Sequence, residues 1–567
     1  MNPRVLTASV LAACLLAVAC GRPLHPWEYR PRPLADTLPI HEPEEVGTSL
    51  AYEQLSASFS ELGRTVAPAR KSRLPPALNA DPCDEVVDSS WFTNRNAREP
   101  LSSAAILRGS RRGDGPDPSG PVTVTSIKST GVSPGFNIED ASGDTYILKF
   151  DTPEEWEMES GAEVVTTNLL WAAGYHVPEN YVFHLDPSKL VLDEELELVA
   201  VRGDTAAVYR AGADDPAREL TMEIFRRHAL ADYPRNPDGS IRAMASKFLE
   251  GIPKGPFAFH GTREDDPNDV IPHQHRRELR GLYVVAAWLN HVDSKEGNNL
   301  DMFVVDPRSP EGEGPPKIGH LRHHLIDFGS ALGSRQDPRN GMENDFDLGA
   351  GTLRLVTLGL YERPWQDMDE SPGTPPGVGY FQVDNFDPGD WRPNIVNPAF
   401  ENRTPRDGYW GSKLVMSFTD EQLEAAVRAG RYSDPAAVAY LLEGLVERRD
   451  ATGRHWFRQV SPLDRPRVEG GAVVYDDLWI RHFGGSARYD YRFRWGAADL
   501  EERGVATRPR IPLPAPPSSV PDVGDPEAVH ARLEVWKVFE DGERAPRPAT
   551  VWLAFEAGAY RVVGVRY

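Results

Sequence analysis

Three short segments constrain the fold of this chain more than any other feature. Each of them lies on a predicted strand or directly after a predicted helix or strand. Tyr146–Phe150 alternates like a strand, so Ile147 and Lys149 lie on one face and apolar residues lie on the other. The segment 291–298 follows a predicted buried helix and precedes a strand. The segment 325–329 continues from another short strand. Polar groups placed in this order beside strands and a buried helix indicate a mixed α+β core with a polar site.

The chemistry of these segments suits phosphate and metal binding. From His291 the chain reads His-Val-Asp-Ser-Lys-Glu-Gly-Asn, in which Asp293 can orient a hydroxyl and Asn298 can bind a metal ion. Leu-Ile-Asp-Phe-Gly follows, with Asp327 as a second metal ligand. Lys149 and Lys295 can neutralise phosphate. The alternatives are a solvated strand lysine and a polar loop that caps a helix.

With the three segments in this order, residues 122–335 resemble the atypical protein-kinase-like fold of phosphoinositide kinases, HipA-type kinases and secretory-pathway kinases. The predicted helix that ends before Gly174 resembles the first helix of that fold. By this resemblance Glu163 is the expected partner of Lys149, with Glu159 one turn earlier as the second choice. Residues 245–251 resemble the hinge between two lobes.

The chain departs from the kinase pattern in several places. It has no G-x-G-x-x-G, so Gly131 and Gly135 would cover the phosphates as a shorter glycine pair. Val292 replaces the arginine of H-R-D and there is no A-P-E, which argues against activation by phosphorylation. The same glycines match G-x-S-x-G, but Pro134 lacks the N–H that a nucleophile elbow needs, so we reject a serine hydrolase.

The resemblance implies a kinase-like phosphotransferase that uses ATP or another nucleotide with Mg²⁺ or Mn²⁺. The expected catalytic residues are Asp293 and Lys295, the metal ligands Asn298 and Asp327, and the nucleotide-binding residues Lys149, Glu163, Ile147, Gly131 and Gly135. Two alternatives stay open, an inactive pseudokinase or binding scaffold and a nucleotidyl transferase using the same residues. The complete set of lysine, two aspartates and asparagine favours activity. The sequence indicates no acceptor.

The N-terminus has the pattern of a secretory signal. Val5–Ala19 is apolar and too short to span a bilayer core of about 30 Å. Leu16–Cys20 resembles the lipobox of bacterial lipoproteins, which implies cleavage before Cys20 and its acylation. Gly21, where aspartate would retain the protein in the inner membrane, favours an extracytoplasmic outer-membrane location. The alternative is an ordinary signal peptide with an incidental cysteine. The lipid anchor is the only membrane contact that we expect.

Composition limits the partners, the disulfides and the metal sites that this chain can have. A formal net charge of −23 argues against nucleic acid as a partner. Cys83 is the only cysteine after Cys20, so the body has no disulfide of its own. Histidines also gather near the predicted site, at positions 273, 275, 320, 323 and 324. Two or three imidazoles can bind zinc, but their strand placement favours a structural role.

The predicted fold class is α+β, with a bilobal protein-kinase-like core followed by a separate all-β, sandwich-like C-terminal domain. Alternating patterns such as Tyr489–Trp495 predict the half-buried strands of that last domain. The predicted domains are a signal peptide (1–19), a proline-rich tether (20–80), an N-lobe (81–250) with an inserted segment (186–242), a C-lobe (251–465) and the all-β module (466–567).

Overall fold

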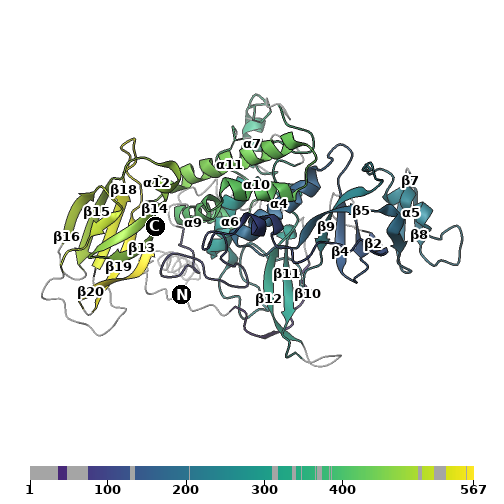
Figure 1. Ribbon diagram of the computed structural model, residues 1–567, viewed down its shortest axis with the longest axis horizontal. Helices are drawn as coiled ribbons and strands as arrows, with labels where there is room; N and C mark the ends of the chain where they lie inside the picture. Colours follow the sequence, from purple (N-terminus) through teal and green to yellow (C-terminus); the bar gives the residue numbers. More distant parts are fainter. Residues whose placement is uncertain are drawn as a thin grey trace, which may run out of the picture. The chain divides into compact units, whose positions relative to one another are not determined.

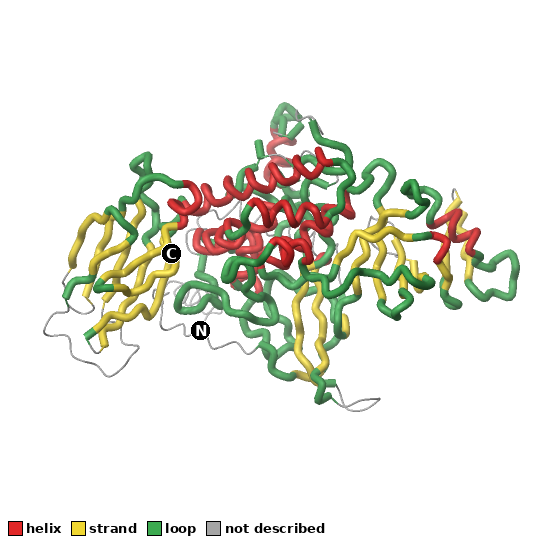
Figure 2. Tube along the Cα trace, viewed as in Figure 1, coloured by secondary structure: helices red, strands yellow, loops and turns green. Residues whose placement is uncertain are grey.

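The computed structural model contains two compact units (Figures 1 and 2). The described residues of 36–77 and 86–460 form the larger unit, and those of 78–85 and 461–567 form the smaller one. Cys20 and Gly131 lie outside the described residues. The structure describes residues 36–47, 74–127, 135–202, 205–309, 317–334, 340–345, 348–363, 365–366, 373–381, 383–384, 386–495, 501–515, 531–556 and 558–567.

A six-stranded sheet carries Lys149 in the larger unit. Its strand order is β5-β9-β4-β3-β2-β6, and all neighbours are antiparallel except β2 and β6. Helix α4 (Met158–Ala173) packs against β5 and β9 and ends at Gly174. The strands are β2 (Val122–Ile127), β3 (Gly135–Glu139), β4 (Thr145–Phe150), β5 (Asn180–Leu185), β6 (Leu190–Leu192) and β9 (Ile241–Lys247).

Helix α4 and six further helices contribute buried residues to the main hydrophobic core of the larger unit. The six are α3 (Ser103–Arg108), α6 (Arg277–Trp288), α8 (Pro398–Glu401), α9 (Pro405–Met416), α10 (Asp420–Ala429) and α11 (Pro435–Phe457). Helices α6 and α9 approach closely through glycines, because a Cβ on Gly411 would lie 2.7 Å from the carbonyl oxygen of Gly281. This close packing fixes the first half of α6, and the predicted catalytic loop begins after the helix ends.

The two strands that follow that loop belong to a four-stranded sheet. Its order is β1-β12-β11-β10, with β1 (Ile40–His41), β10 (Ile252–Pro253), β11 (Asn299–Val305) and β12 (Ile318–Leu325). The pairing of Asn299 with Leu325 brings the start of β11 to the end of β12. Strand β1 lies within the predicted tether 20–80 and pairs with the outer edge of β12.

The inserted segment contains the hairpin β7 (Glu197–Arg202) and β8 (Thr205–Arg210) as well as helix α5 (Met222–Ala229). The sequence predicts a strand at 196–201 and a helix at about 217–230, which β7 and α5 confirm, and β8 is an additional strand. The sequence of residues 337–420 predicts mostly loop, and this prediction is wrong for α9 and for α7 (Leu348–Val356). Gly408 and Gly411 lower the helix propensity of α9, but their small size lets the helix pack closely on Trp456 and α6.

The described part of the smaller unit is mostly β-structure. One sheet has the order β16-β15-β18-β19-β20 and the other β13-β14-β17, with one short helix, α12 (Leu478–Phe483). Its strands are β13 (Leu463–Glu469), β14 (Ala472–Asp477), β15 (Tyr489–Trp495), β16 (Glu501–Ala506), β17 (Arg510–Pro512), β18 (Ala531–Lys537), β19 (Ala549–Glu556) and β20 (Ala559–Arg566). Residues 78–85 join this unit, where the carbonyl of Pro82 accepts a hydrogen bond from the N–H of Val565 at 2.7 Å.

The mixed α+β class is therefore confirmed. The bilobal kinase-like core, the separate sandwich-like domain and the domain boundaries stay predictions. Within the described ranges, the structure contains no helix with the length and apolar character that crossing a bilayer requires.

Candidate functional site

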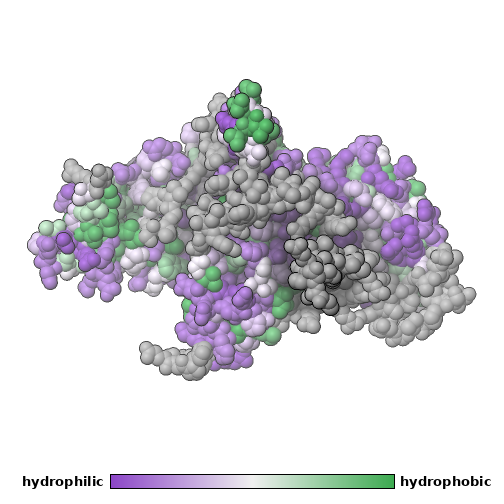
Figure 3. Space-filling model, turned by 180° about the vertical axis from the view of Figure 1, so that it is seen from behind, coloured by the Kyte–Doolittle hydropathy of each residue, from purple (hydrophilic) through white to green (hydrophobic). Residues whose placement is uncertain are grey.

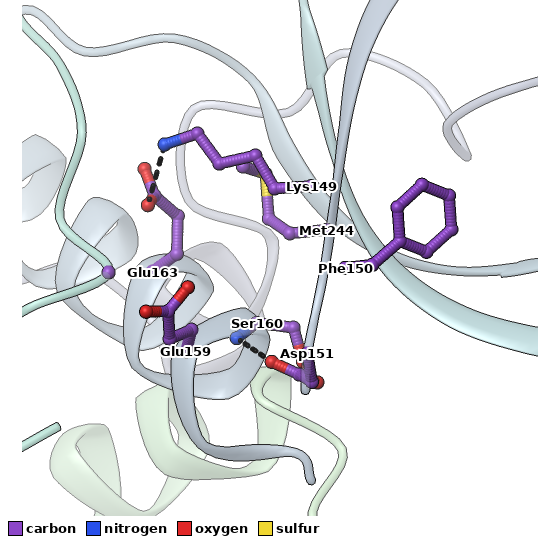
Figure 4. Close-up of a pocket in the computed structure, with 8 residues that line it drawn as sticks. Lys149, Phe150, Asp151, Glu159, Ser160, Glu163 and Met244 are labelled. Atoms are coloured by element: carbon purple, nitrogen blue, oxygen red, sulfur yellow. Dashed lines mark hydrogen bonds and ion pairs between the residues drawn. The ribbon is translucent and has the colours of Figure 1, made fainter. Parts of the chain in front are cut away.

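The lysine of strand β4 lies between two carboxylates from distant parts of the chain. The Nζ atom of Lys149 is 2.8 Å from Oδ1 of Asp327. It is also 3.4 Å from Oε2 of Glu163 (Figure 4). Burial alone would lower the pKa of Lys149, but the two carboxylates outweigh it and raise the pKa above its ordinary value. Lys149 is therefore a fixed positive charge. We call Lys149, Glu163 and Asp327 the lysine cluster.

Glu163 is held on its second oxygen by a residue that the sequence analysis missed. Asn180, at the start of β5, donates one hydrogen bond to Oε1 of Glu163 at 3.2 Å and another to Oγ1 of Thr167 at 2.9 Å. Burial raises the pKa of Glu163, and Lys149 opposes that effect. A polar residue at the first position of a strand after Pro178 is a weak signal, because its partner lies on α4 and is not evident from the sequence.

The start of α4 is fixed beside the lysine cluster. Asp151 accepts hydrogen bonds from the N–H of Ser160 at 2.8 Å and from its hydroxyl at 2.6 Å. Nε of the buried Arg242 donates to the same hydroxyl at 2.8 Å. These contacts satisfy polar groups of the first helical turn. A small pocket in this region is lined by Lys149, Phe150, Asp151, Glu159, Ser160, Glu163, Met244 and Gly329 (Figure 4).

The loop after α6 folds back on its aspartate. Lys295 Nζ lies 2.8 and 2.9 Å from the two carboxylate oxygens of Asp293. The side-chain amide of Asn298 donates to the backbone carbonyl of Asp293 and to its Oδ2, both at 2.8 Å. The three predicted residues of this loop are thus in direct contact. They form what we call the loop cluster, Asp293, Lys295 and Asn298.

Backbone pairing brings the loop cluster next to the lysine cluster. The N–H of Ile326, the residue before Asp327, donates to the carbonyl of Asn298 at 3.1 Å. The rings of His291 and Phe328 meet edge to face with centroids 5.4 Å apart. Asp327 has a φ of 62°, a left-handed conformation that is uncommon for a residue with a side chain and is often found at functional sites.

The donor set fits Mg²⁺ or Mn²⁺ better than zinc. Asp327, whose side chain is 46% exposed, and Asn298 offer one carboxylate and one amide oxygen. Mg²⁺ prefers oxygen ligands and is commonly held by one or two protein side chains together with phosphate oxygens. Among the described residues, no three His, Cys, Asp or Glu side chains come together to hold a metal ion.

Two of the clustered histidines have structural partners. His273 Nε2 lies 2.6 Å from Oδ2 of Asp269, and His323 Nδ1 lies 2.6 Å from Oδ1 of Asp301. The ring of His323 also stacks on Trp91 with centroids 3.5 Å apart. These contacts favour the structural reading of both histidines over the zinc alternative.

The other predicted nucleotide-binding residues that the structure describes are Ile147 on β4 and Gly135 on β3. Ile147 and Lys149 are both half-buried and alternate with buried neighbours on β4, as expected for one shared face. Gly135 lies opposite Lys149 in the register of β3 and β4. A Cβ on Gly135 would lie 2.0 Å from the carbonyl oxygen of Leu148, so strand packing alone requires glycine there.

His291 predicts acid sensitivity of this region. It is 4% exposed, and burial lowers its pKa to about 4 against the opposing charges of Asp293 and Asp327. In the unfolded chain the pKa of His291 is about 6.5, so above that pH the imidazole is neutral in both states and the stability is at its full value. As the pH falls from 6.5 toward 4, the unfolded chain takes up a proton that the folded protein does not, and the free energy of unfolding decreases. At about pH 5 the loss from this residue is about 2 kcal/mol.

The measurement is urea denaturation of the wild type and His291→Gln at about pH 7.5 and about pH 5. The free energy of unfolding should fall between these two pH values in the wild type. In His291→Gln this fall should be about 2 kcal/mol smaller. An equal fall in both proteins would mean that His291 does not carry this pH dependence.

Comparisons with known proteins add little to this geometry. No protein-family model matches the chain, and no curated protein matches it either. A solved structure described as the crystal structure of the golgi casein kinase aligns with 74% of this chain and 95% of its own, at 9% sequence identity and a TM-score of 0.27. At this TM-score the likeness carries no argument. The resemblance to kinases therefore rests on the sequence segments and on the geometry of the two clusters.

Proposed function

We propose that this chain is a metal- and nucleotide-dependent phosphotransferase of the kinase type. The observation that carries the proposal is the position of Lys149, which contacts Glu163 on one side and Asp327 on the other. Such a charge arrangement suits a site where a lysine braces nucleotide phosphates and an aspartate binds their metal ion. The loop cluster, hydrogen-bonded to the segment that precedes Asp327, supports the same proposal.

Each residue has a distinct task in this proposal. Lys149 binds the phosphates of ATP or another nucleotide, and Glu163 keeps its ammonium group in place. A Mg²⁺ or Mn²⁺ ion held by Asp327 and Asn298 would supply charge neutralisation on the phosphates. Asp293 orients the acceptor hydroxyl and takes up its proton, while Lys295, in contact with Asp293, faces the charge that develops on the transferred group. Positioning and charge neutralisation would supply most of the rate enhancement.

The direct test is nucleotide binding by the purified protein. We expect ATP to raise the melting temperature in the presence of Mg²⁺ or Mn²⁺ and to have a much smaller effect when EDTA is present. Calorimetry with other nucleotides would identify the preferred donor. If the protein binds no nucleotide with either metal ion, the phosphotransferase proposal fails and the scaffold alternative takes its place.

We also propose that the protein is a lipoprotein anchored outside the cytoplasm, on the outer membrane. The support is the small-residue run that ends at Cys20 and the glycine after it. Cys20→Ser should abolish incorporation of radioactive palmitate, because the thioether that carries the diacylglycerol needs the Cys20 sulfur. Cys83→Ser is the matched control and should keep the label. Labelling of Cys20→Ser at the wild-type level would contradict the lipobox prediction.

A further inference from the structure

Helix α7 and the turn after it form the most apolar exposed surface among the described residues of the larger unit. The exposed fractions are 76% for Leu355, 73% for Val356, 91% for Leu358 and 87% for Leu360. From Leu348 to Tyr361 the chain has one charged residue, Arg354, although 26% of the whole chain is charged. A hydrophobic group is visible over α7 at the top of the space-filling view (Figure 3). Exposed apolar patches of this kind usually mark a contact surface.

Both ends of the segment that contains α7 are attached to the rest of the larger unit. On the entering side, the N–H of Asp345 donates to the carbonyl of Asn394 at 2.7 Å. On the returning side, Arg363 forms an ion pair with the mostly buried Glu343. Residues two positions apart in sequence therefore hold both ends of the excursion against the unit.

The tip is also ordered by its own hydrogen bonds. The N–H of Gly359 donates to the carbonyl of Arg354 at 2.8 Å, and the N–H of Thr357 donates to the carbonyl of Leu353 at 2.9 Å. Leu358 and Gly359 have φ values of 53° and 87°, as at a helix C-terminus that is closed by left-handed residues. The leucines are thus presented by a hydrogen-bonded structure.

The distribution of apolar residues favours a lipid surface over a protein groove. A helix that binds in a protein groove presents one stripe of residues spaced three or four apart. In α7, Leu353 and Leu355 are separated by about 200° around the helix axis, and both are exposed. All residues from Gly351 to Val356 are exposed, so this described part of the helix is apolar on more than one side.

The predicted lipid anchor would tether the larger unit, which carries α7, to a bilayer. Only 15 residues separate Cys20 from Asp36, the first described residue, and these can extend by at most about 55 Å. The helix has nine residues, which corresponds to about 13 Å, less than half of a hydrocarbon core of about 30 Å. It can enter one leaflet without crossing the membrane.

We propose that α7 and residues 357–361 insert into the lipid bilayer, as a second membrane contact beside the lipid anchor that the sequence predicts as the only one. Apolar side chains leave water for the acyl boundary, which is favourable by the hydrophobic effect. Because the net charge is −23, the acidic body opposes an anionic surface, and we expect stronger insertion into phosphatidylcholine than into mixtures with phosphatidylglycerol. This inference is independent of the phosphotransferase proposal.

The first test reads the environment of one residue in the full-length protein. Leu358→Cys in a Cys83→Ala background is labelled with the fluorophore NBD and mixed with phosphatidylcholine vesicles. Its emission should shift to the blue and be quenched by doxyl-labelled lipid. Val270→Cys, at another exposed apolar residue of the same unit, should show neither change. The Cys83→Ala parent gives the background labelling in the absence of a cysteine at position 358.

The second test measures binding. In vesicle flotation, Leu355→Gln, Leu358→Gln and Leu360→Gln together should lower the fraction bound per lipid by about tenfold or more. The matched triple variant replaces exposed valines of the β7–β8 hairpin, Val199, Val201 and Val208, and should bind like the wild type. All six side chains are exposed, so both triple variants should keep the wild-type melting temperature.

Three results would overturn the proposal. The first is an unchanged NBD emission at position 358 when vesicles are added, and the second is equal flotation of the two triple variants. The third is a blue shift at position 358 that grows with protein concentration in the absence of lipid, because a second copy of the chain would then cover α7.

Discussion

Asp293→Asn is expected to bind nucleotide and Mg²⁺ almost as the wild type does and to transfer phosphate about 10²–10⁴-fold more slowly, as for the loss of a positioned base. Asp293 contacts Lys295 and Asn298 but is not part of the lysine cluster. The substitution keeps the volume of the side chain and removes its charge. Calorimetry for binding and labelled-phosphate transfer, including autophosphorylation, measure the two effects separately.

Asp327→Ala should lose both binding and transfer. Asp327 is the proposed metal ligand and also a partner of Lys149 at 2.8 Å. Asp306→Ala, which removes a carboxylate just after the other end of β11, is the control and should leave both quantities unchanged. If Asp293→Asn binds nucleotide and transfers phosphate as fast as the wild type, the loop cluster does not have the proposed role. If both site variants and the wild type bind nucleotide equally, Asp327 is not the metal ligand.

Asp407→Ala is expected to have the largest effect on stability. Asp407 is fully buried between two buried arginines, with Arg277 Nε at 2.9 Å and Arg280 Nη1 at 3.3 Å. It also accepts hydrogen bonds from the N–H and hydroxyl of Thr404, which cap α9. Removing this carboxylate leaves two buried guanidinium groups without their counter-charge, a change that typically costs about 3–5 kcal/mol.

The control for Asp407→Ala is Asp420→Ala. Asp420 forms an ion pair with Arg449 at 2.7 Å, but its side chain is 65% exposed, so its loss should cost less than about 1 kcal/mol. Urea denaturation gives the free energy of unfolding for both variants. Equal destabilisation of the two proteins would show that the buried arginine pair does not depend on Asp407.

Local periodicity predicted the elements that carry the site. The alternation of Thr145–Phe150 placed Lys149 on the half-buried face of β4, and the apolar face of residues 276–290 predicted α6 and therefore the loop after it. In both cases the decisive pattern lies within a few residues. Pairing of Lys149 with Glu163 needed the family resemblance as well, because nothing local selects Glu163 over Glu159.

What the sequence did not predict depends on contacts between distant segments. Asn180 contacts Glu163 across the space between β5 and α4, and the short segment around Pro82 joins the smaller unit through Val565. Helix α9 was missed because its glycines lower helix propensity locally, while the reason for them lies on α6 and on Trp456. The identity of each of these residues depends on a partner that is far away in the sequence. Local propensity and periodicity therefore do not predict them.

Strand β1 connects the larger unit to the N-terminal segment that carries the predicted lipid anchor. Only Ile40 and His41 pair with β12, opposite Gly319 and Ile318, and the other end of β12 leads to Asp327. If Cys20 is acylated, tension on the anchor acts first on Asp36, whose carboxylate accepts hydrogen bonds from the N–H and the hydroxyl of Ser90, and only then on the pairing of β1. These contacts would have to break before force reached β12. The start of the described chain would therefore shield the site from tension on the membrane anchor.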